Sequence, residues 1–216
     1  MGRRRSRRLL RACGKSSEAN ALRLIALGAS TGGVEALQTV LAGFPASCPP
    51  TLVVQHMKPD FLPRFPLRLA DRCKARVVAA EDGKPLLPGH IYVAADPDAH
   101  LTVELRRQPV CRIIPGAPVS GHRPSVDELF HSLAQFGPRV AAALLTGMGR
   151  DGASGLHEIR KRGGTTIGQD AATSVVYGMP RVAHEIGAVL FQLPLPRICA
   201  ALLMGRPSIA QGASLS

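Results

Sequence analysis

Tryptophan is absent from this sequence of 216 residues, and only 4% of its residues are aromatic. It also has no apolar stretch of the roughly 18 residues needed to cross a bilayer, so we expect no insertion into a membrane. Cysteines are few, odd in number and without a C-x-x-C pair: Cys13, Cys48, Cys73, Cys111 and Cys199. Their spacing argues against a disulfide framework and against a zinc site, and it fits a protein of the reducing cytoplasm.

Acidic residues are missing from the first 15 positions, although seven of the 27 Lys and Arg residues lie there. The net charge of +12 is therefore concentrated in this segment, and the rest of the chain is only mildly basic. We expect residues 1–20 to form a disordered basic extension and residues 205–216 a disordered tail. No apolar segment follows the arginines, so the extension is not a secretory signal. No aromatic residues interleave it either, which argues against binding of nucleic acid.

Between these ends, residues 21–204 alternate short apolar runs with amphipathic stretches and form the one expected domain. Apolar runs predict strands at 24–28, 51–55, 76–80, 90–95, 100–105, 110–114, 139–146, 165–168 and 188–192. Helical spacing predicts helices at 34–42, 125–136, 153–162, 180–186 and 196–204, and a proline-broken, partly helical segment at 59–71.

This alternation indicates a doubly wound α/β fold, in which a mostly parallel sheet has helices on both faces. Connections between residues 76 and 114 are too short for crossover helices, so we expect an antiparallel hairpin at one side of the sheet. Ser125 is expected to cap the helix that follows it, with Glu128 completing a capping box.

One serine lies at a glycine-flanked turn, Gly28-Ala29-Ser30-Thr31-Gly32-Gly33, where a buried strand is expected to end. Ligands and catalytic groups collect at the carboxyl ends of parallel strands in an open α/β sheet. Amides at the start of the next helix could stabilise an oxyanion near this serine. Two other interpretations stay open: a simple N-cap of helix 34–42, and a dinucleotide fingerprint, which lacks the usual acid about 20 residues on.

Two further strand ends carry the partners that a nucleophilic serine needs. His56 follows the run 51–55, and Asp151 lies in a glycine-rich turn before a helix, where it could also be a simple N-cap. A serine hydroxyl becomes a good nucleophile when a neutral imidazole takes its proton and a carboxylate fixes the imidazole tautomer. Ser30, His56 and Asp151 are therefore the predicted triad, and its chemistry needs no metal and no cofactor. Activity should fall as His56 becomes protonated.

Five segments together resemble the catalytic domain of chemotaxis protein-glutamate methylesterases. They are IALGASTGG at 25–33, VQHM at 54–57, GHRPSVDELF at 121–130, LTGMGRDGA at 145–153 and QDAATSVVYGMP at 169–180. The resemblance implies a doubly wound α/β fold with a hairpin at one side. It also implies hydrolysis of γ-glutamyl methyl esters on chemoreceptors to glutamate and methanol, and for some members deamidation of receptor glutamines.

Carried over by these motifs, the resemblance implies a nucleophile, a base that then acts as an acid, and an orienting carboxylate: Ser30, His56 and Asp151. It implies two residues at the oxyanion site and two at the border of the cleft: Thr31 and Met148, and Arg123 and Met179. The implied partner is a methylated chemoreceptor or a receptor-like protein.

Members of this family that act in chemotaxis usually carry a phosphorylation receiver domain before the catalytic domain. Only about 23 residues precede the first expected strand, too few for such a domain, so we expect a fragment or a stand-alone enzyme. A separate receiver-domain protein would then be a further partner. Two other functions remain open: an inactive regulatory or receptor-binding module of the same fold, and a nucleic-acid binder that acts through the basic arm.

Overall fold

A computed structural model describes residues 23–204 of the chain, so both predicted disordered segments lie outside the described residues. The strands are β1 (Leu24–Ala29), β2 (Thr51–Gln55), β3 (Arg76–Ala79), β4 (His90–Val93), β5 (Ala99–Leu105), β6 (Pro109–Pro115), β7 (Val140–Leu144), β8 (Thr165–Gln169) and β9 (Phe191–Leu193). The helices are α1 (Gly33–Ala42), α2 (Phe65–Ala70), α3 (Val126–Ala134), α4 (Ala153–Lys161), α5 (Met179–Glu185) and α6 (Leu195–Met204), with short 3₁₀ turns η1 (Pro59–Arg64) and η2 (Gly137–Arg139).

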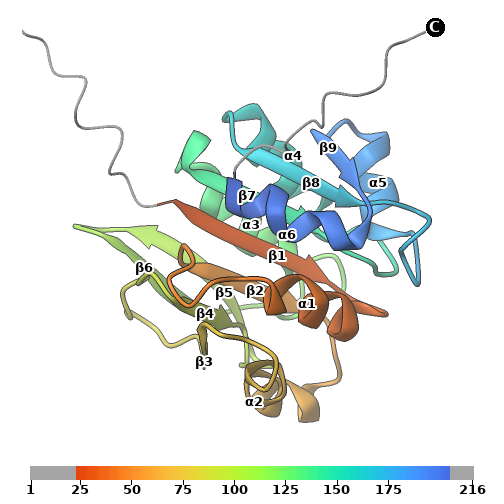
Figure 1. Ribbon diagram of the computed structural model, residues 1–216. Coiled ribbons are helices and arrows are strands. Elements are labelled where there is room, and N and C mark those ends of the chain that lie inside the picture. The colour runs from red at the N-terminus through yellow and green to blue at the C-terminus, as the bar shows by residue number, and fades with distance from the viewer. Residues whose placement is uncertain (1–22, 205–216) are drawn as a thin grey trace, which may run out of the picture.

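Seven strands form one parallel sheet in the order β3-β4-β2-β1-β7-β8-β9 (Figure 1). The chain starts near the centre with β1, builds one half through β2, β3 and β4, and then crosses to β7 to build the other half. This is the predicted doubly wound arrangement. Its switch point lies at β1, between β2 and β7, and the carboxyl ends of these strands are the expected place for a site.

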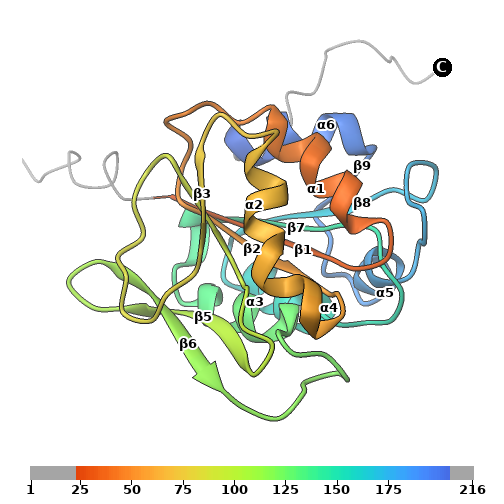
Figure 2. The ribbon, with the colours of Figure 1, turned by 90° about the horizontal axis from the view of Figure 1, so that it is seen from below.

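Helices cover both faces of the sheet, with α1, α2 and α6 on one side and α3, α4 and α5 on the other (Figure 2). Because side chains alternate along a strand, β1 serves both layers. Leu24 and Ala26 pack with the α3 side, whereas Ile25 and Leu27 pack with the α1 side. All six residues of β1 are buried, which explains why this segment is a continuous apolar run.

The predicted hairpin is β5 and β6, which pair antiparallel, and β5 packs on α3. By contrast, β3 and β4 are parallel although the connection 80–89 contains no helix. This connection lies along β6, where the Leu86 N–H donates to Pro109 and the Cys111 N–H donates to Lys84, at 2.9 and 2.8 Å. The hairpin thus satisfies backbone groups of the crossover that a helix would otherwise satisfy internally.

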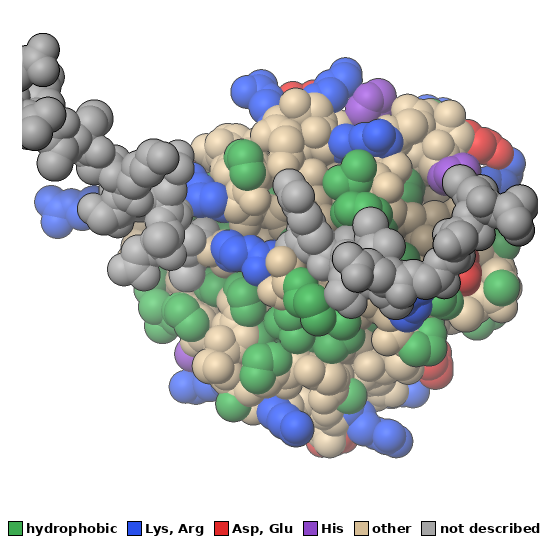
Figure 3. Space-filling view, turned by 45° about the horizontal axis from the view of Figure 1, so that its top comes forward, with side chains coloured by type: hydrophobic (Ala, Val, Ile, Leu, Met, Phe, Trp, Pro, Cys, Tyr) green, Lys and Arg blue, Asp and Glu red, His purple; other side chains and the backbone are tan. Residues whose placement is uncertain are grey.

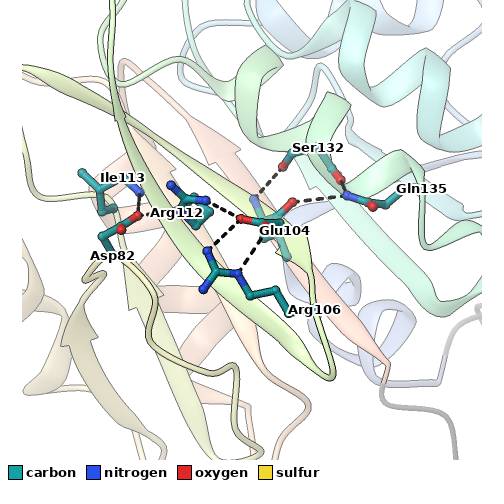
Figure 4. A network of polar contacts seen from close by, with 8 residues as sticks. Asp82, Glu104, Arg106, Arg112, Ile113, Ser132 and Gln135 are labelled. Atoms are coloured by element: carbon teal, nitrogen blue, oxygen red, sulfur yellow. Dashed lines mark hydrogen bonds and ion pairs between the residues drawn. The ribbon is translucent and has the colours of Figure 1, made fainter.

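Polar contacts hold the hairpin in place (Figure 4). Arg112 of β6 pairs with Glu104 of β5 and with Asp82 of the connection. On the other side, Ser132 of α3 accepts the Val103 N–H at 3.0 Å. These contacts fix β5 and β6, and the loop that runs from β6 to α3 forms one border of the site described below.

Basic side chains are spread over the face seen in Figure 3 and do not gather in one stripe. Among the helices of residues 23–204, none combines the length and the apolar character that crossing a bilayer requires.

Helices α3 and α4 approach closely at Gly155, and this contact can be tested. A Cβ added there would lie 2.6 Å from the Cβ of Phe130 and 3.0 Å from the Asp127 carbonyl. Alanine improves helix propensity by about 1 kcal/mol, but overpacking costs about 1–3 kcal/mol. We therefore expect Gly155→Ala to lower the free energy of unfolding by about 1–2 kcal/mol in urea titrations. The neighbouring exposed position, in Ser154→Ala, should change it little; a more stable Gly155→Ala protein would contradict the close packing.

Candidate active site

Ser30 and His56 are neighbours at the carboxyl edge of the sheet. β1 and β2 pair in parallel as far as Ala29 and Gln55, and Ser30 and His56 are the next residue of each chain segment. The His56 N–H extends the ladder by donating to the Ala29 carbonyl at 2.9 Å. Adjacent strands are about 4.8 Å apart, so the two residues lie side by side. Strand alternation directs both side chains to the face that α3 covers.

The Asp151 carboxylate, from the turn after β7, meets His56. His56 Nε2 lies 2.8 Å from Asp151 Oδ2, and the Asp151 side chain is 1% exposed. The same carboxylate accepts the Ser125 hydroxyl at 2.7 Å, the Val126 N–H at 2.7 Å and the Asp127 N–H at 3.1 Å. These donors form the start of α3, where unpaired N–H groups and the helix dipole favour an anion.

The surroundings of Asp151 keep it ionised. Burial acts to raise its pKa, but hydrogen bonds from His56, Val126 and Ser125 together outweigh burial and hold the pKa below the usual value. The adjacent Asp127 behaves in the opposite way, because burial and the negative charge of Asp151 raise its pKa against the Gly155 N–H bond. Of the two neighbouring carboxyl groups, Asp151 is therefore the one whose surroundings favour the ionised form.

Neither Ser30 nor Asp151 is the N-cap of the helix that follows it, so both capping interpretations are wrong. The N-cap of α1 is Gly32 and that of α4 is Gly152, and neither helix has a side-chain cap. Ser30 therefore does not cap the helix after it, and Asp151 binds the start of α3 instead of its own helix.

The predicted capping box of α3 is half correct. The Ser125 hydroxyl accepts the Glu128 N–H at 3.4 Å. The Ser125 N–H, however, donates to His100 Nδ1 at 3.1 Å and not to the Glu128 side chain. His100 Nε2 in turn donates to the Ala117 carbonyl at 3.0 Å, so His100 is a neutral tautomer that fastens β5 to the start of α3.

The His56 ring has one occupied nitrogen and one free nitrogen. Because Asp151 accepts at Nε2, the proton resides there and Nδ1 carries the lone pair. Nδ1 is buried, and no group of the described residues bonds to it. The Ser30 hydroxyl likewise has no hydrogen bond within residues 23–204. The structure thus joins His56 to Asp151 and brings Ser30 beside them, while the Ser30–His56 bond is not formed; in enzymes without substrate such bonds are often long.

Close packing fixes the turn that carries Ser30. Gly32 has φ 77°, a conformation that favours glycine. At Gly33 a Cβ would overlap the Gln55 amide and would lie 2.6 Å from the Ala29 Cβ. These glycines let the chain turn sharply beside Gln55, so they serve the position of Ser30, and nothing in the turn requires a dinucleotide.

A row of buried amides, absent from the predicted site, ties the strand ends together. Gln55 Nε2 donates to the carbonyls of Ser30 and His56, both at 2.8 Å. The Ser30 N–H donates to the Thr146 carbonyl at 3.0 Å, and the Thr146 N–H donates to Gln169 Oε1 at 2.8 Å. The sequence did offer a signal for Gln55 and Gln169, since each is a glutamine at the end of a strand of mostly buried residues.

The predicted oxyanion residues lie next to Ser30. Within residues 23–204, the N–H groups of Thr31 and Met148 donate to no other group, and the Met148 side chain is 73% exposed. Gly147 packs directly on the turn that carries Ser30, where a Cβ would lie 2.7 Å from the Ser30 Cβ. Two backbone donors without a partner in the described residues therefore belong to the two segments that meet at Ser30.

The two predicted cleft residues differ in their roles. Arg123 lines a hollow of about 280 Å³ together with His56, Met57, Lys58 and His122. Its guanidinium donates to the carbonyls of Pro97 and Gly116, both at 2.8 Å, so Arg123 fastens the rim. Met179 is fully buried and its sulfur packs beneath Gly147, so its side chain supports the turn from inside and does not face the cleft.

The fold and this site define a doubly wound α/β domain with Ser, His and Asp side chains at its switch point. A sequence model of the CheB methylesterase family matches residues 25–202. The chain belongs to this family.

Known proteins agree with that assignment. The chain is 54% identical over 177 residues to "Protein-glutamate methylesterase/protein-glutamine glutaminase 1" of Rhizobium johnstonii, covering 82% of this chain and 51% of the relative. It is 50% identical over 192 residues to the protein-glutamate methylesterase/protein-glutamine glutaminase of Agrobacterium fabrum, covering 88% and 55%. The chain spans about half the length of these curated relatives. The crystal structure of the Thermotoga maritima CheB methylesterase catalytic domain matches with a TM-score of 0.82 at 33% identity, covering 85% of this chain and 98% of that chain.

The pH dependence of stability tests the ionised state of Asp151. Hydrogen bonds lower its folded-state pKa, so its stabilisation is complete above the unfolded pKa of about 3.9 and disappears as the pH falls through the lower folded pKa. At pH 7, Asp151→Asn should lower the free energy of unfolding by about 2–3 kcal/mol, and this difference should shrink in acid.

Urea titrations between pH 3 and pH 7 measure this difference. Asp127→Asn is the matched control: because the pKa of Asp127 is raised, the difference between wild type and this variant should change with pH in the opposite direction. If the free energy of unfolding of Asp151→Asn differs from that of wild type by the same amount at pH 3 and at pH 7, Asp151 is not the ionised carboxylate.

The amide of Gln55 should control how well the Ser30 turn is held. Gln55→Met keeps the side-chain length but removes both hydrogen bonds, so we expect Ser30 to react about 10- to 100-fold more slowly with a serine-directed phosphonate. Gln38→Met is the control, since the Gln38 amide reaches only the Arg68 carbonyl at 3.4 Å. Equal labelling rates for the two variants would show that Gln55 has no influence on Ser30.

Proposed function

We propose that this chain is a serine esterase that hydrolyses γ-glutamyl methyl esters on chemoreceptor proteins. In this proposal Ser30 is the nucleophile, His56 the general base and then acid, and Asp151 the orienting carboxylate. The observation that carries the proposal is the His56 ring: it is bonded to Asp151 through Nε2, its Nδ1 is unbonded, and its strand end is the neighbour of the strand end that carries Ser30. The names of the relatives describe the same chemistry for those proteins.

In the acylation step, one proton moves through His56 and the Ser30 oxygen replaces the methoxy group of the ester. The Ser30 hydroxyl gives its proton to His56 Nδ1 while Ser30 Oγ bonds to the ester carbonyl carbon. The resulting imidazolium is stabilised by Asp151, which stays ionised. When the tetrahedral intermediate collapses, the C–O bond to the methoxy group breaks, and methanol leaves with the proton from Nδ1.

Hydrolysis of the acyl-enzyme repeats these steps with water. His56 takes a proton from the water, the hydroxide adds to the acyl carbon, and Ser30 leaves with that proton to give free glutamate. A receptor glutamine would follow the same route with ammonia as the leaving group. Methyl esters and primary amides are similar in size, so one cleft accepts both.

The open N–H groups of Thr31 and Met148 are suited to hold the oxyanion. The negative charge appears on the carbonyl oxygen only in the tetrahedral state, so donors already aimed at it stabilise the transition state more than the substrate. Loss of one such donor costs about 100- to 1000-fold in rate in serine hydrolases.

The proposed substrate is a glutamate side chain on the surface of a receptor. The hollow beside His56 is open and lined by Met57, Lys58 and Arg123, which suits a methyl ester carried by an acidic protein segment. We place the reaction in the cytoplasm; Cys48, Cys73, Cys111 and Cys199 are free thiols, as that compartment favours.

Methanol release from methylated receptor membranes tests the function. Wild-type protein should release methanol, and Ser30→Ala should lower the rate by at least about 10⁴-fold, because no nucleophile remains. Ser154→Ala, a serine exposed on α4, is the matched control and should keep the wild-type rate. Equal release by wild type and Ser30→Ala would end the esterase proposal. No release by wild type would favour an inactive regulatory module.

A further inference from the structure

A second histidine lies flat on His56. The rings of His56 and His122 are parallel within 6°, with centroids 3.7 Å apart. The His56 side chain is only 5% exposed, although it borders an open hollow. His122 comes from the loop between β6 and α3, far in sequence from both strand ends that carry Ser30 and His56.

The backbone of His122 is fixed on both sides. Val119 and His122 exchange two backbone hydrogen bonds, at 3.0 and 2.9 Å, across a tight turn in which Ser120 and Gly121 have φ 53° and 80°. The next residue, Arg123, donates to Pro97 and Gly116 and pairs with Asp98 at 2.7 Å. The His122 ring is therefore presented by a rigid loop.

We propose that His122 is a positioning residue for the reaction: its ring holds the His56 imidazole in the plane that joins Asp151 to Ser30 and shields that imidazole from water. This inference rests on the proposed function of the site. A histidine held by one hydrogen bond can still rotate about its broad terminal torsion, and each rotation turns Nδ1 away from the serine. A flat ring stacked on one face removes this freedom.

Shielding adds to the effect of orientation. Without the His122 ring, water could enter the site around His56 and compete, in the plane of the imidazole, for Nδ1 and for the Nε2–H bond to Asp151. With water excluded, the attraction between the imidazolium and the carboxylate is stronger than in bulk solvent. The stacked ring thus favours the charged intermediate as well as the ground-state geometry.

The charge of His122 must stay zero for this role. Burial lowers the pKa of His122, nearby His56 lowers it further, and Asp151 opposes both. Lys58 also lines the hollow, and Arg123 lies there with its charge paired to Asp98. A second imidazolium 3.7 Å from a protonated His56 would be repelled, so a neutral His122 is compatible with proton transfer and a charged one is not.

Kinetics of two variants test the positioning role. His122→Ala removes the ring, and we expect kcat for methanol release to fall about 10- to 100-fold with little change in KM, because the reacting groups are misaligned. His122→Phe keeps a flat ring that cannot be protonated and should restore kcat to within a few-fold of wild type. Its rate should also fall less steeply in acid. His184→Ala, an exposed histidine on α5, is the control.

The imidazole NMR spectrum gives a readout that is independent of esterase activity. The His56 Nε2 proton, bonded to Asp151, should exchange slowly with water in wild type and in His122→Phe, and rapidly in His122→Ala. If wild type releases no methanol but shows this pattern, His122 still holds and shields the His56 ring, and it is the proposed function that fails.

Two results would overturn the inference. One is wild-type kcat and slow proton exchange in His122→Ala. The other is a loss in His122→Phe as large as that in His122→Ala. Thermal unfolding checks the fold of each variant. If His122→Ala does not fold, His122→Leu replaces it, because leucine fills the space without a flat ring; an equally active His122→Leu protein would also refute the proposal.

Discussion

The site depends on one buried anion. Asp151 reaches the start of α3, where the Ser125 hydroxyl and two backbone N–H groups bind its carboxylate. The same carboxylate also accepts a hydrogen bond from His56. Burial alone would neutralise a carboxylate, so the helix start makes the charge possible and the charge orients the imidazole. Helix α3 is therefore part of the proposed catalytic machinery, although none of its own side chains needs to contact the ester.

A second constraint is the alignment of strand ends. The hydrogen bonds from Gln55 to Ser30, from Ser30 to Thr146 and from Thr146 to Gln169 cross four neighbouring strands in one row. A displacement of any of these strands along its axis would break a bond in the row. The parallel sheet thus sets the position of the nucleophile relative to the base, while α3 sets the position of the base relative to its carboxylate.

Much of this was predictable because the signals are local. Apolar runs marked the strands, and Ser30, His56 and Asp151 could be proposed because each follows such a run at a turn. Long-range contacts gave no comparable signal. The stacking of His122 on His56 arises only when the loop after β6 folds back, and His100 takes the place expected for Glu128 at Ser125. The helix-free link between β3 and β4 depends on a hairpin that the chain forms later.

At this site, two neighbouring carboxyl groups, and likewise two neighbouring imidazoles, differ in how readily they become charged. Asp151 has four donors and remains an anion, whereas Asp127, with fewer donors and Asp151 beside it, has a raised pKa. The two stacked histidines are subject to the same logic, since two positively charged imidazolium rings would repel each other at a centroid distance of 3.7 Å. With Asp151 bonded to His56 and not to His122, the positive charge of the proposed intermediate is stabilised on His56. In the proposed reaction, the same contacts that bind Asp151 to the start of α3 thereby decide which imidazole receives the serine proton.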